Sequence, residues 1–221
     1  MIIGTPDPAV LFMGREGSPS DEAVVRETWV ENVYRIEEGD LGPGKTFLDV
    51  GANIGAVSVY AARAGSYVVA VEPDPANLDY LRANMMALAP VGGYDIIEAA
   101  AVGGRAGTVR IMQCHGNSHI SEDGQVEVDA STLEDIIMRP DMLLLDGDID
   151  VCKVDIEGAE YELIESTPLR VLERIRYLTL EFNAAPDDVF GLMVAKLAHS
   201  FAVTVLGSPE RGGYIYARRY D

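Results

Sequence analysis

The residues best suited to bind a ligand lie at 46–55, where an acid and two glycines follow an apolar run. The residues of Thr46–Val50 predict a buried strand, and a helix is expected to begin near Ala56. Between them, Gly51 allows a sharp turn and lets a ligand approach the main chain. Gly55 removes a side chain where the helix packs on the sheet. Such a turn brings a ligand to the carboxyl end of a strand and the N-terminus of a helix, where doubly wound α/β proteins bind nucleotides.

The spacing of acids and glycines indicates which nucleotide would fit. From Asp49 the sequence reads D-x-G-x-x-x-G, and lacks the G-x-G-x-x-G that positions a pyrophosphate. A carboxylate at Asp49 would repel a pyrophosphate but suits a cationic amine. Glu72 ends the next apolar run, about twenty residues further on, where an acid accepts hydrogen bonds from ribose hydroxyls. These residues predict a pocket for S-adenosylmethionine; the alternative is an ordinary glycine turn with two solvated acids.

Length and charge narrow the classes of protein. A chain of 221 residues fits one α/β domain, so we expect residues 1–221 to form a single domain. The net charge of −19 argues against a nucleic-acid partner, because binding a phosphate backbone needs a basic face. The basic cluster of Arg211, Arg218 and Arg219 is interpreted as a solvated chain end. Two cysteines, no signal peptide and no long apolar run indicate a soluble, cytoplasmic protein without membrane contact.

Strands and helices alternate along most of the chain. This order implies a parallel sheet with right-handed crossovers, and the last two strands suit a hairpin that makes one strand antiparallel. The expected strands are residues 46–50, 67–71, 95–101, 151–154, 176–182, 202–206 and 214–218. The main helices are expected at residues 56–64, 75–88, 159–166 and 184–199.

The first segment stands apart from this alternation. Residues 1–45 are predicted to form a strand and a helix that cap the cofactor pocket. Asp21 is expected to be the N-cap of a helix at 22–32. Trp29 either packs this helix on the domain or, with Tyr34, faces the cofactor.

Residues 105–130 are predicted to form a β-hairpin and loop inserted near the acceptor site. Alternating runs at 107–113 and 125–129 flank a polar loop. The loop carries four polar side chains, His115, Asn117, Ser118 and His119. Since imidazole titrates near neutral pH, His119 is one candidate general base. The alternative is an exposed histidine without a catalytic role.

A family resemblance rests on three stretches: Phe47-Leu48-Asp49-Val50-Gly51-Ala52-Asn53-Ile54-Gly55, Val71-Glu72-Pro73-Asp74-Pro75, and Lys153-Val154-Asp155-Ile156-Glu157-Gly158-Ala159-Glu160. On these the chain resembles the FkbM-type S-adenosylmethionine-dependent methyltransferases. The first stretch marks class I methyltransferases broadly, and the K-x-D-x-E-G-x-E stretch is specific to the family. The chain departs from the pattern at Gly103-Gly104, where members usually carry an acid, and in a longer, more acidic segment at 140–150.

The resemblance implies the Rossmann-like α/β fold of class I methyltransferases. This fold has a seven-stranded, mostly parallel sheet in the order 3-2-1-4-5-7-6, with helices on both faces. It implies that a set of residues surrounds the cofactor, with Glu72 on the ribose: Asp49, Gly51, Ala52, Asn53, Gly55, Glu72, Asp74, Ala101 and Asp155. Two of them have alternatives, since Asp74 suits an N-cap before Pro75 and Ala101 suits plain packing.

The candidate catalytic residues are Asp155, Glu157, Glu181 and His119. The three acids are expected to converge at neighbouring strand ends. A hydroxyl acceptor must lose its proton, and a partly buried carboxylate can take it. Which residue is the base stays open. Clustered carboxylates also suit Mg²⁺ or Ca²⁺, although no metal site is favoured.

The resemblance implies a reaction as well as a fold. Family members mostly methylate hydroxyls on sugars, glycans or secondary metabolites, so we expect an O-methyltransferase that uses S-adenosylmethionine and releases S-adenosylhomocysteine. The expected partner is a small-molecule or glycan acceptor, with no nucleic acid. Alternatives are N-methylation of a small molecule or modified nucleobase, and an inactive cofactor-binding subunit. A nicotinamide-dependent oxidoreductase is disfavoured because G-x-G-x-x-G is missing. Neither the acceptor nor the oligomeric state follows from the sequence.

Overall fold

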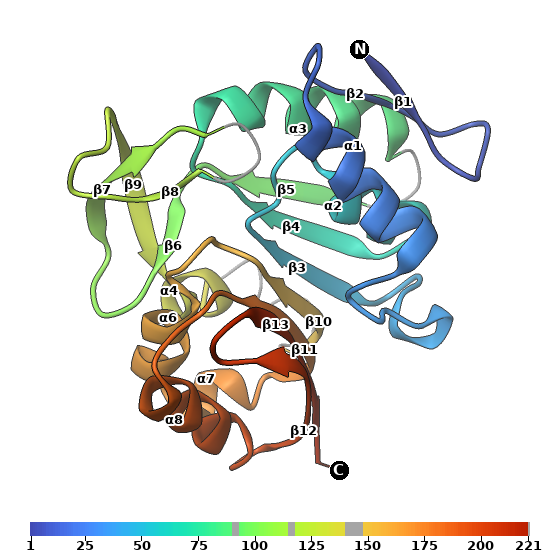
Figure 1. The fold of residues 1–221 in the computed structure, drawn as a ribbon. Coiled ribbons are helices and arrows are strands. Elements are labelled where there is room, and N and C mark those ends of the chain that lie inside the picture. Colours follow the sequence, from blue (N-terminus) through green and yellow to red (C-terminus); the bar gives the residue numbers. More distant parts are fainter. Residues whose placement is uncertain (90–92, 115–117, 140–147, 221) are drawn as a thin grey trace.

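A mostly parallel sheet forms the centre of the fold (Figure 1). The computed structural model describes residues 1–89, 93–114, 118–139 and 148–220. Within these ranges the main sheet has seven strands in the order β12-β13-β11-β10-β3-β4-β5. They are β3 Thr46–Val50, β4 Tyr67–Val71, β5 Tyr94–Ile97, β10 Ile149–Val154, β11 Ile175–Phe182, β12 Phe201–Ser208 and β13 Gly212–Arg219.

The pairing of these strands gives the expected α/β topology. Numbered along the chain, the order reads 3-2-1-4-5-7-6. Strand β3 pairs in parallel with β4 and β10, and β10 with β11, whereas β13 is antiparallel to both β11 and β12. Strand β3 is buried along its whole length, as a strand covered on both faces must be. The predicted mostly parallel fold is confirmed.

Helices cover both faces of the sheet (Figure 1). Because neighbouring residues of a strand point to opposite faces, Phe47 belongs to one apolar cluster and Leu48 to the other. The first cluster joins the sheet to α1 Pro19–Arg26, α2 Ala56–Arg63 and α3 Pro75–Leu88. The second joins it to α4 Leu133–Ile137, α6 Glu160–Ser166, α7 Leu169–Leu172 and α8 Asp187–Leu197.

The N-terminal segment differs from the prediction at the start of its helix. The N-cap of α1 is Ser18, so the assignment of Asp21 as N-cap is wrong. Pro19 occupies the first helical turn and starts the helix earlier. The buried Asp21 carboxylate instead accepts hydrogen bonds from Arg15 N and Nε. The other elements of the segment are β1 Ile2–Gly4, β2 Leu11–Met13, the π-helix η1 Glu27–Glu31 and the 3₁₀-helix η2 Glu38–Asp40.

A second sheet replaces part of a predicted strand. Its order is β6-β9-β7-β8, from β6 Ala100–Val102, β7 Gly107–Met112, β8 His119–Ile120 and β9 Val126–Thr132. The expected strand at 95–101 is therefore two strands, because β6 leaves the main sheet to pair in parallel with β9. Strands β7 and β9 pair antiparallel, as the alternating runs predict. Part of the polar loop, including His115 and Asn117, lies outside the described residues.

Candidate cofactor and acceptor site

The glycine turn after β3 needs glycine at two positions. The backbone angle φ is 85° at Gly51, 52° at Asn53 and 90° at Gly55, in the region that favours glycine. A Cβ at Gly51 would lie 1.8 Å from the Asp155 carbonyl oxygen, so the turn directly contacts the end of β10. A Cβ at Gly55 would lie 2.8 Å from Leu81 Cδ1 on α3. The turn therefore brings the ends of β3 and β10 and the side of α3 together.

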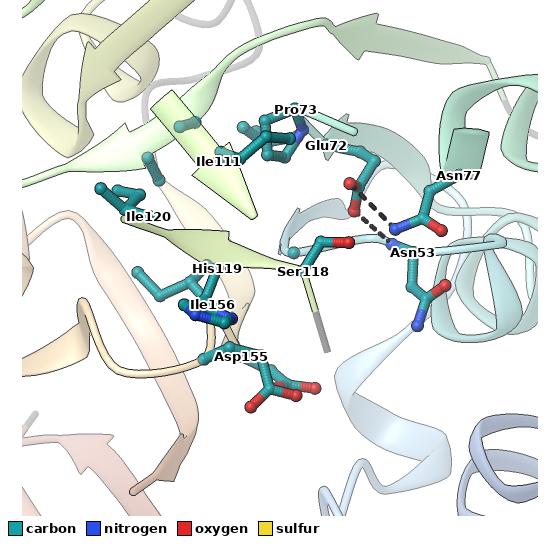
Figure 2. Close-up of a pocket in the computed structure, with 15 residues that line it drawn as sticks. Asn53, Glu72, Pro73, Asn77, Ile111, Ser118, His119, Ile120, Asp155 and Ile156 are labelled. Atoms are coloured by element: carbon teal, nitrogen blue, oxygen red, sulfur yellow. Dashed lines mark hydrogen bonds between the residues drawn. The ribbon is translucent and has the colours of Figure 1, made fainter. Parts of the chain in front are cut away.

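Glu72, directly after β4, is held by three N–H groups, and Figure 2 shows the bonds from Asn53 and Asn77. Asn53 N donates to Oε2 at 2.8 Å, Asp74 N donates to Oε1 at 2.8 Å, and Asn77 Nδ2 donates to Oε1 at 3.2 Å. Burial raises the pKa of Glu72 to about 7, although these donors oppose the shift. The carboxylate is thus fixed beside the turn and titrates near neutral pH.

Asp74 is the N-cap of α3, and it also anchors the second sheet. Its Oδ1 accepts from Ala76 N at 2.9 Å, which confirms the N-cap assignment. Gln113 Nε2 donates to Oδ1 and Ser118 Oγ to Oδ2, both at 2.6 Å. Since Asp74 is 1% exposed, these bonds hold residues 113 and 118 over the end of β4.

A cavity opens at the carboxyl ends of β3, β4 and β10 (Figure 2). The predicted site residues that line it are Gly51, Asn53, Glu72, Ala101, His119, Asp155 and Glu157. Its apolar walls come from Val71, Pro73, Ala100, Ile111, Ile120 and Ile156. The predicted residues outside its lining are Asp49, Ala52, Gly55, Asp74 and Glu181. A concave pocket that combines apolar walls with a few polar groups is typical of a small-molecule site.

Lys153 lies beneath the turn and connects two predicted acids. Its Nζ donates to Gly51 O at 2.6 Å and lies 3.2 Å from Asp49 Oδ1 and 3.6 Å from Asp155 Oδ2. Burial opposes the cation, but the charges of Asp49 and Asp155 outweigh it and raise the pKa of Lys153. Asp49 also accepts from Ser58 Oγ at 2.7 Å and is 0% exposed. Asp49 therefore supports the turn from below and does not face the cavity.

The candidate catalytic acids gather around Asp155. Tyr34 donates its hydroxyl to Asp155 Oδ2 at 2.9 Å. Burial and the charge of Asp155 raise the pKa of Tyr34, and the same causes raise the pKa of Glu157. Burial, with the charge of Asp155, raises the pKa of Glu181 to about 8. Glu181 lies on β11 outside the lining of the cavity, and its raised pKa favours the protonated carboxyl group.

Trp29 lies away from the cavity lining, whereas His119 is part of it. Trp29 donates from Nε1 to Ala56 O at 3.2 Å and packs edge-on against Phe12 and Tyr60, so it fastens the N-terminal segment to α2. His119 lies on β8 at the cavity and is exposed. Among the described residues, no group of three or more His, Cys, Asp or Glu side chains is placed to hold a metal ion.

Several contacts of the site were not predicted from the sequence. Glu160 is buried and accepts from Gly158 N at 2.6 Å and Asn183 N at 2.9 Å, which ties the loop after β10 to the end of β11. Lys153 on β10 and Asp155 directly after the strand lie two residues apart, a spacing that puts strand side chains on one face and could have pointed to their contact. Nothing in the local sequence predicts the contact of Tyr34 with Asp155.

Together, the strand order, the glycine turn after the first strand of the sheet and the acid after the second define a class I S-adenosylmethionine-dependent methyltransferase. The family profile described as Methyltransferase FkbM domain matches residues 49–216. The chain belongs to the FkbM methyltransferase family. No curated protein matches it.

Several solved structures that align with the chain are methyltransferases. The precorrin-6y C5,15-methyltransferase of Geobacter metallireducens aligns with a TM-score of 0.52 at 17% identity, over 98% of both chains. An rRNA methylase of Streptococcus thermophilus aligns at 0.54 and 12% identity, over 89% of this chain and 98% of that one. A putative rRNA methylase of Clostridium thermocellum aligns at 0.54 and 8% identity, over 87% and 96%.

These structures correct one prediction about partners. Two of them are rRNA methylases, so the expectation that nucleic acid is excluded is wrong. The inference failed because net charge is a sum over the whole chain, whereas a nucleic acid contacts only one face. Although the net charge of the chain is −19, four arginines lie on or beside the β11–β13 part of the sheet: Arg35, Arg176, Arg218 and Arg219.

Among the described residues, no helix has both the length and the apolar character to cross a bilayer.

Proposed function

We propose that this methyltransferase transfers a methyl group to a hydroxyl oxygen of an acceptor bound beside Asp155. The observation that carries the proposal is the position of Asp155, which lines the cavity next to the glycine turn and has one carboxylate oxygen fixed by Tyr34. Its other oxygen, Oδ1, makes no hydrogen bond to the described residues. Asp155 Oδ1 is therefore available to accept the proton of a hydroxyl group.

The residues around the cavity fit the methyl donor. Glu72 is fixed by three N–H donors, and in this proposal it accepts hydrogen bonds from the ribose hydroxyls. Gly51 and Asn53 line the part of the cavity at the turn, where the amino-acid tail would lie, and Ala101 leaves room for the adenine ring. Bound there, S-adenosylmethionine supplies a methyl group on a positively charged sulfur.

The chain's own groups then position the acceptor and remove its proton. Lys153 and Tyr34 hold Asp155 in one orientation, which favours an in-line approach of the hydroxyl oxygen. A neutral Glu181 donates a hydrogen bond to the acceptor, and Asp155 takes the proton as the new O–CH₃ bond forms and the bond from sulfur to the methyl carbon breaks. Glu157 also lines the cavity.

Two experiments test this proposal in order. Calorimetric titration with S-adenosylmethionine, S-adenosylhomocysteine and NADH should show binding of the sulfur nucleotides only, and Glu72→Ala should lose it. Transfer of a labelled methyl group should then be screened over hydroxylated sugars, their amino analogues, nucleosides and RNA. Transfer to hydroxyls that is lost in Asp155→Asn supports the proposal; transfer to amines alone, or full activity in Asp155→Asn, refutes it.

A further inference from the structure

Side chains on one face of β11, β13 and β12 extend from Glu181, at the end of the sheet nearest the cavity, to a second hollow at the opposite end of these strands. Side chains paired across antiparallel strands share a face, so the register defines successive rows. The row nearest the cavity is Glu181, Tyr214 and Leu206; the next is Thr179, Tyr216 and Thr204; the last is Tyr177, Arg218 and Ala202. We call these rows the tyrosine face.

The tyrosine face is exposed along its β12 edge, whereas Tyr177 and Tyr216 are 2% and 7% exposed. On β12, Leu206 is 51% exposed, and Thr204 and Ala202 are exposed as well. On the opposite face of β13, Ile215 and Ala217 are 0% exposed. The hollow at the far end is lined by Arg35, Glu37, Tyr177, Ala202, Thr204, Tyr216 and Arg218.

Two arginines stack over the tyrosines of this hollow. The guanidinium carbon of Arg35 lies 4.3 Å from the centre of the Tyr216 ring, and that of Arg218 lies 4.1 Å from the Tyr177 ring. Arg218 donates to both oxygens of Asp40, at 2.8 and 2.9 Å, so its charge is already compensated. Arg35 is exposed and forms no ion pair with the described residues. It is the cation that can receive an external anion.

The hollow is connected to the catalytic end through tyrosine hydroxyls. Tyr177 donates to Tyr34 O and Tyr216 to Val33 O, each at 2.8 Å. Tyr34 in turn donates to Asp155. The Tyr214 ring lies 6.1 Å from the Tyr34 ring and 6.3 Å from the Tyr216 ring, and is stacked with the latter. Aromatic side chains therefore continue from Asp155 to the hollow.

We propose that the hollow at Arg35 binds an anionic group of the acceptor, a carboxylate or a phosphate. This rests on the proposed function, in which the methylated hydroxyl lies beside Asp155. Tyr177 is four residues before Glu181 on β11, a separation of about 13 Å along the strand. That exceeds the screening length of about 8 Å at physiological salt. When an acidic acceptor binds this way, its anionic group stays away from the acids around Asp155. The ring or chain that joins this group to the methylated hydroxyl then lies over Tyr214.

Binding of simple anions tests the proposal without knowledge of the acceptor. ¹H–¹⁵N NMR titrations with inorganic phosphate, acetate and an eight-residue oligo-uridylate should shift amide signals of the hollow, such as those of Arg35 and Thr204. In Arg35→Gln, which keeps an uncharged side chain over Tyr216, the affinity should fall by about tenfold or more. The control Arg170→Gln removes the same charge from α7, on the opposite face, and should have no effect.

The outcomes distinguish a failure of the anion-site proposal from a failure of the proposed methyl-transfer reaction. Comparing the three probes shows whether a carboxylate, a free phosphate or a nucleic-acid phosphate is preferred. No shift at the hollow with any probe, or equal affinity in wild type and Arg35→Gln, overturns the proposal. Calorimetry with S-adenosylhomocysteine on the same proteins reports the cofactor site alone. If wild type does not bind S-adenosylhomocysteine, the methyltransferase assignment is refuted, whatever the result of the anion titrations.

Discussion

Replacing Lys153 by methionine should destabilise the protein far more than removing an exposed ion pair. Lys153 Nζ contacts Asp49 Oδ1 at 3.2 Å, Asp155 Oδ2 at 3.6 Å and Gly51 O at 2.6 Å. Lys153 is 2% exposed and Asp49 is 0% exposed. Methionine fills similar space but leaves Asp49 buried without its cation. Removing one partner of a buried pair costs about 3–5 kcal/mol, so we expect a loss of that size in the free energy of unfolding at pH 8.

The size of this loss should depend on pH in a defined direction. Although burial opposes it, the charges of Asp49 and Asp155 raise the pKa of Lys153 in the folded protein. A cation with a raised pKa stabilises the fold fully below its unfolded pKa of about 10.4, and this contribution is lost only as the pH rises through the folded value. The loss in Lys153→Met should therefore be complete at pH 8. It should shrink below about pH 4, where carboxylates become protonated.

Urea unfolding followed by circular dichroism measures this loss. Arg82→Met is the matched control, because it removes an ion pair with Glu98 whose side chains are 44% and 56% exposed. Such a pair contributes about 0–1 kcal/mol. The double variant Asp49→Asn/Lys153→Met should recover stability, since it removes the uncompensated charge. The reasoning is refuted if Lys153→Met costs no more than Arg82→Met, or if the double variant recovers nothing.

Three further predictions concern the site. Tyr34→Phe removes the donor that fixes Asp155, so methyl transfer should fall about tenfold or more while the calorimetric Kd of S-adenosylmethionine stays unchanged; parallel weakening of both would contradict this. Glu181→Gln keeps a neutral hydrogen-bond donor, so the decline of kcat/KM expected above pH 8, as Glu181 ionises, should be absent from its pH profile. Because burial raises the pKa of Glu72 to about 7, affinity for S-adenosylmethionine should rise up to about tenfold from pH 6 to pH 8; a flat calorimetric profile would exclude the ribose role.

The parts of the fold that the sequence predicts well depend on local requirements. Gly51 and Gly55 adopt backbone angles that favour glycine, and both are visible as a pattern within ten residues. The bounds of Thr46–Val50, Tyr67–Val71 and Pro75–Leu88 agree with the prediction because apolar runs, glycines and prolines mark their ends. Glu72 follows from the same logic, since it directly ends an apolar strand.

The parts that escaped prediction depend on contacts between distant segments. Lys153 meets Asp49 because the two are register partners on β10 and β3, and a register between strands a hundred residues apart cannot be derived from either strand alone. Tyr34 reaches Asp155 across 121 residues of chain. Residues 100–102 look like the end of one strand in sequence, yet they pair with β9 in a second sheet.

The negative charge of the acids around Asp155 complements the positive charge of the methyl donor. Asp155, Glu157 and Glu181 lie near Lys153, the single buried cation among the described residues, and burial together with the charge of Asp155 raises the pKa of Glu157 and Glu181. A positively charged sulfonium placed among these acids lowers the repulsion, whereas the neutral thioether that remains after transfer does not. If the donor binds as proposed, these charges favour the donor over the product. An acidic acceptor would be repelled by these acids, and in our proposal its anion lies beyond them, where the tyrosine face ends at Arg35.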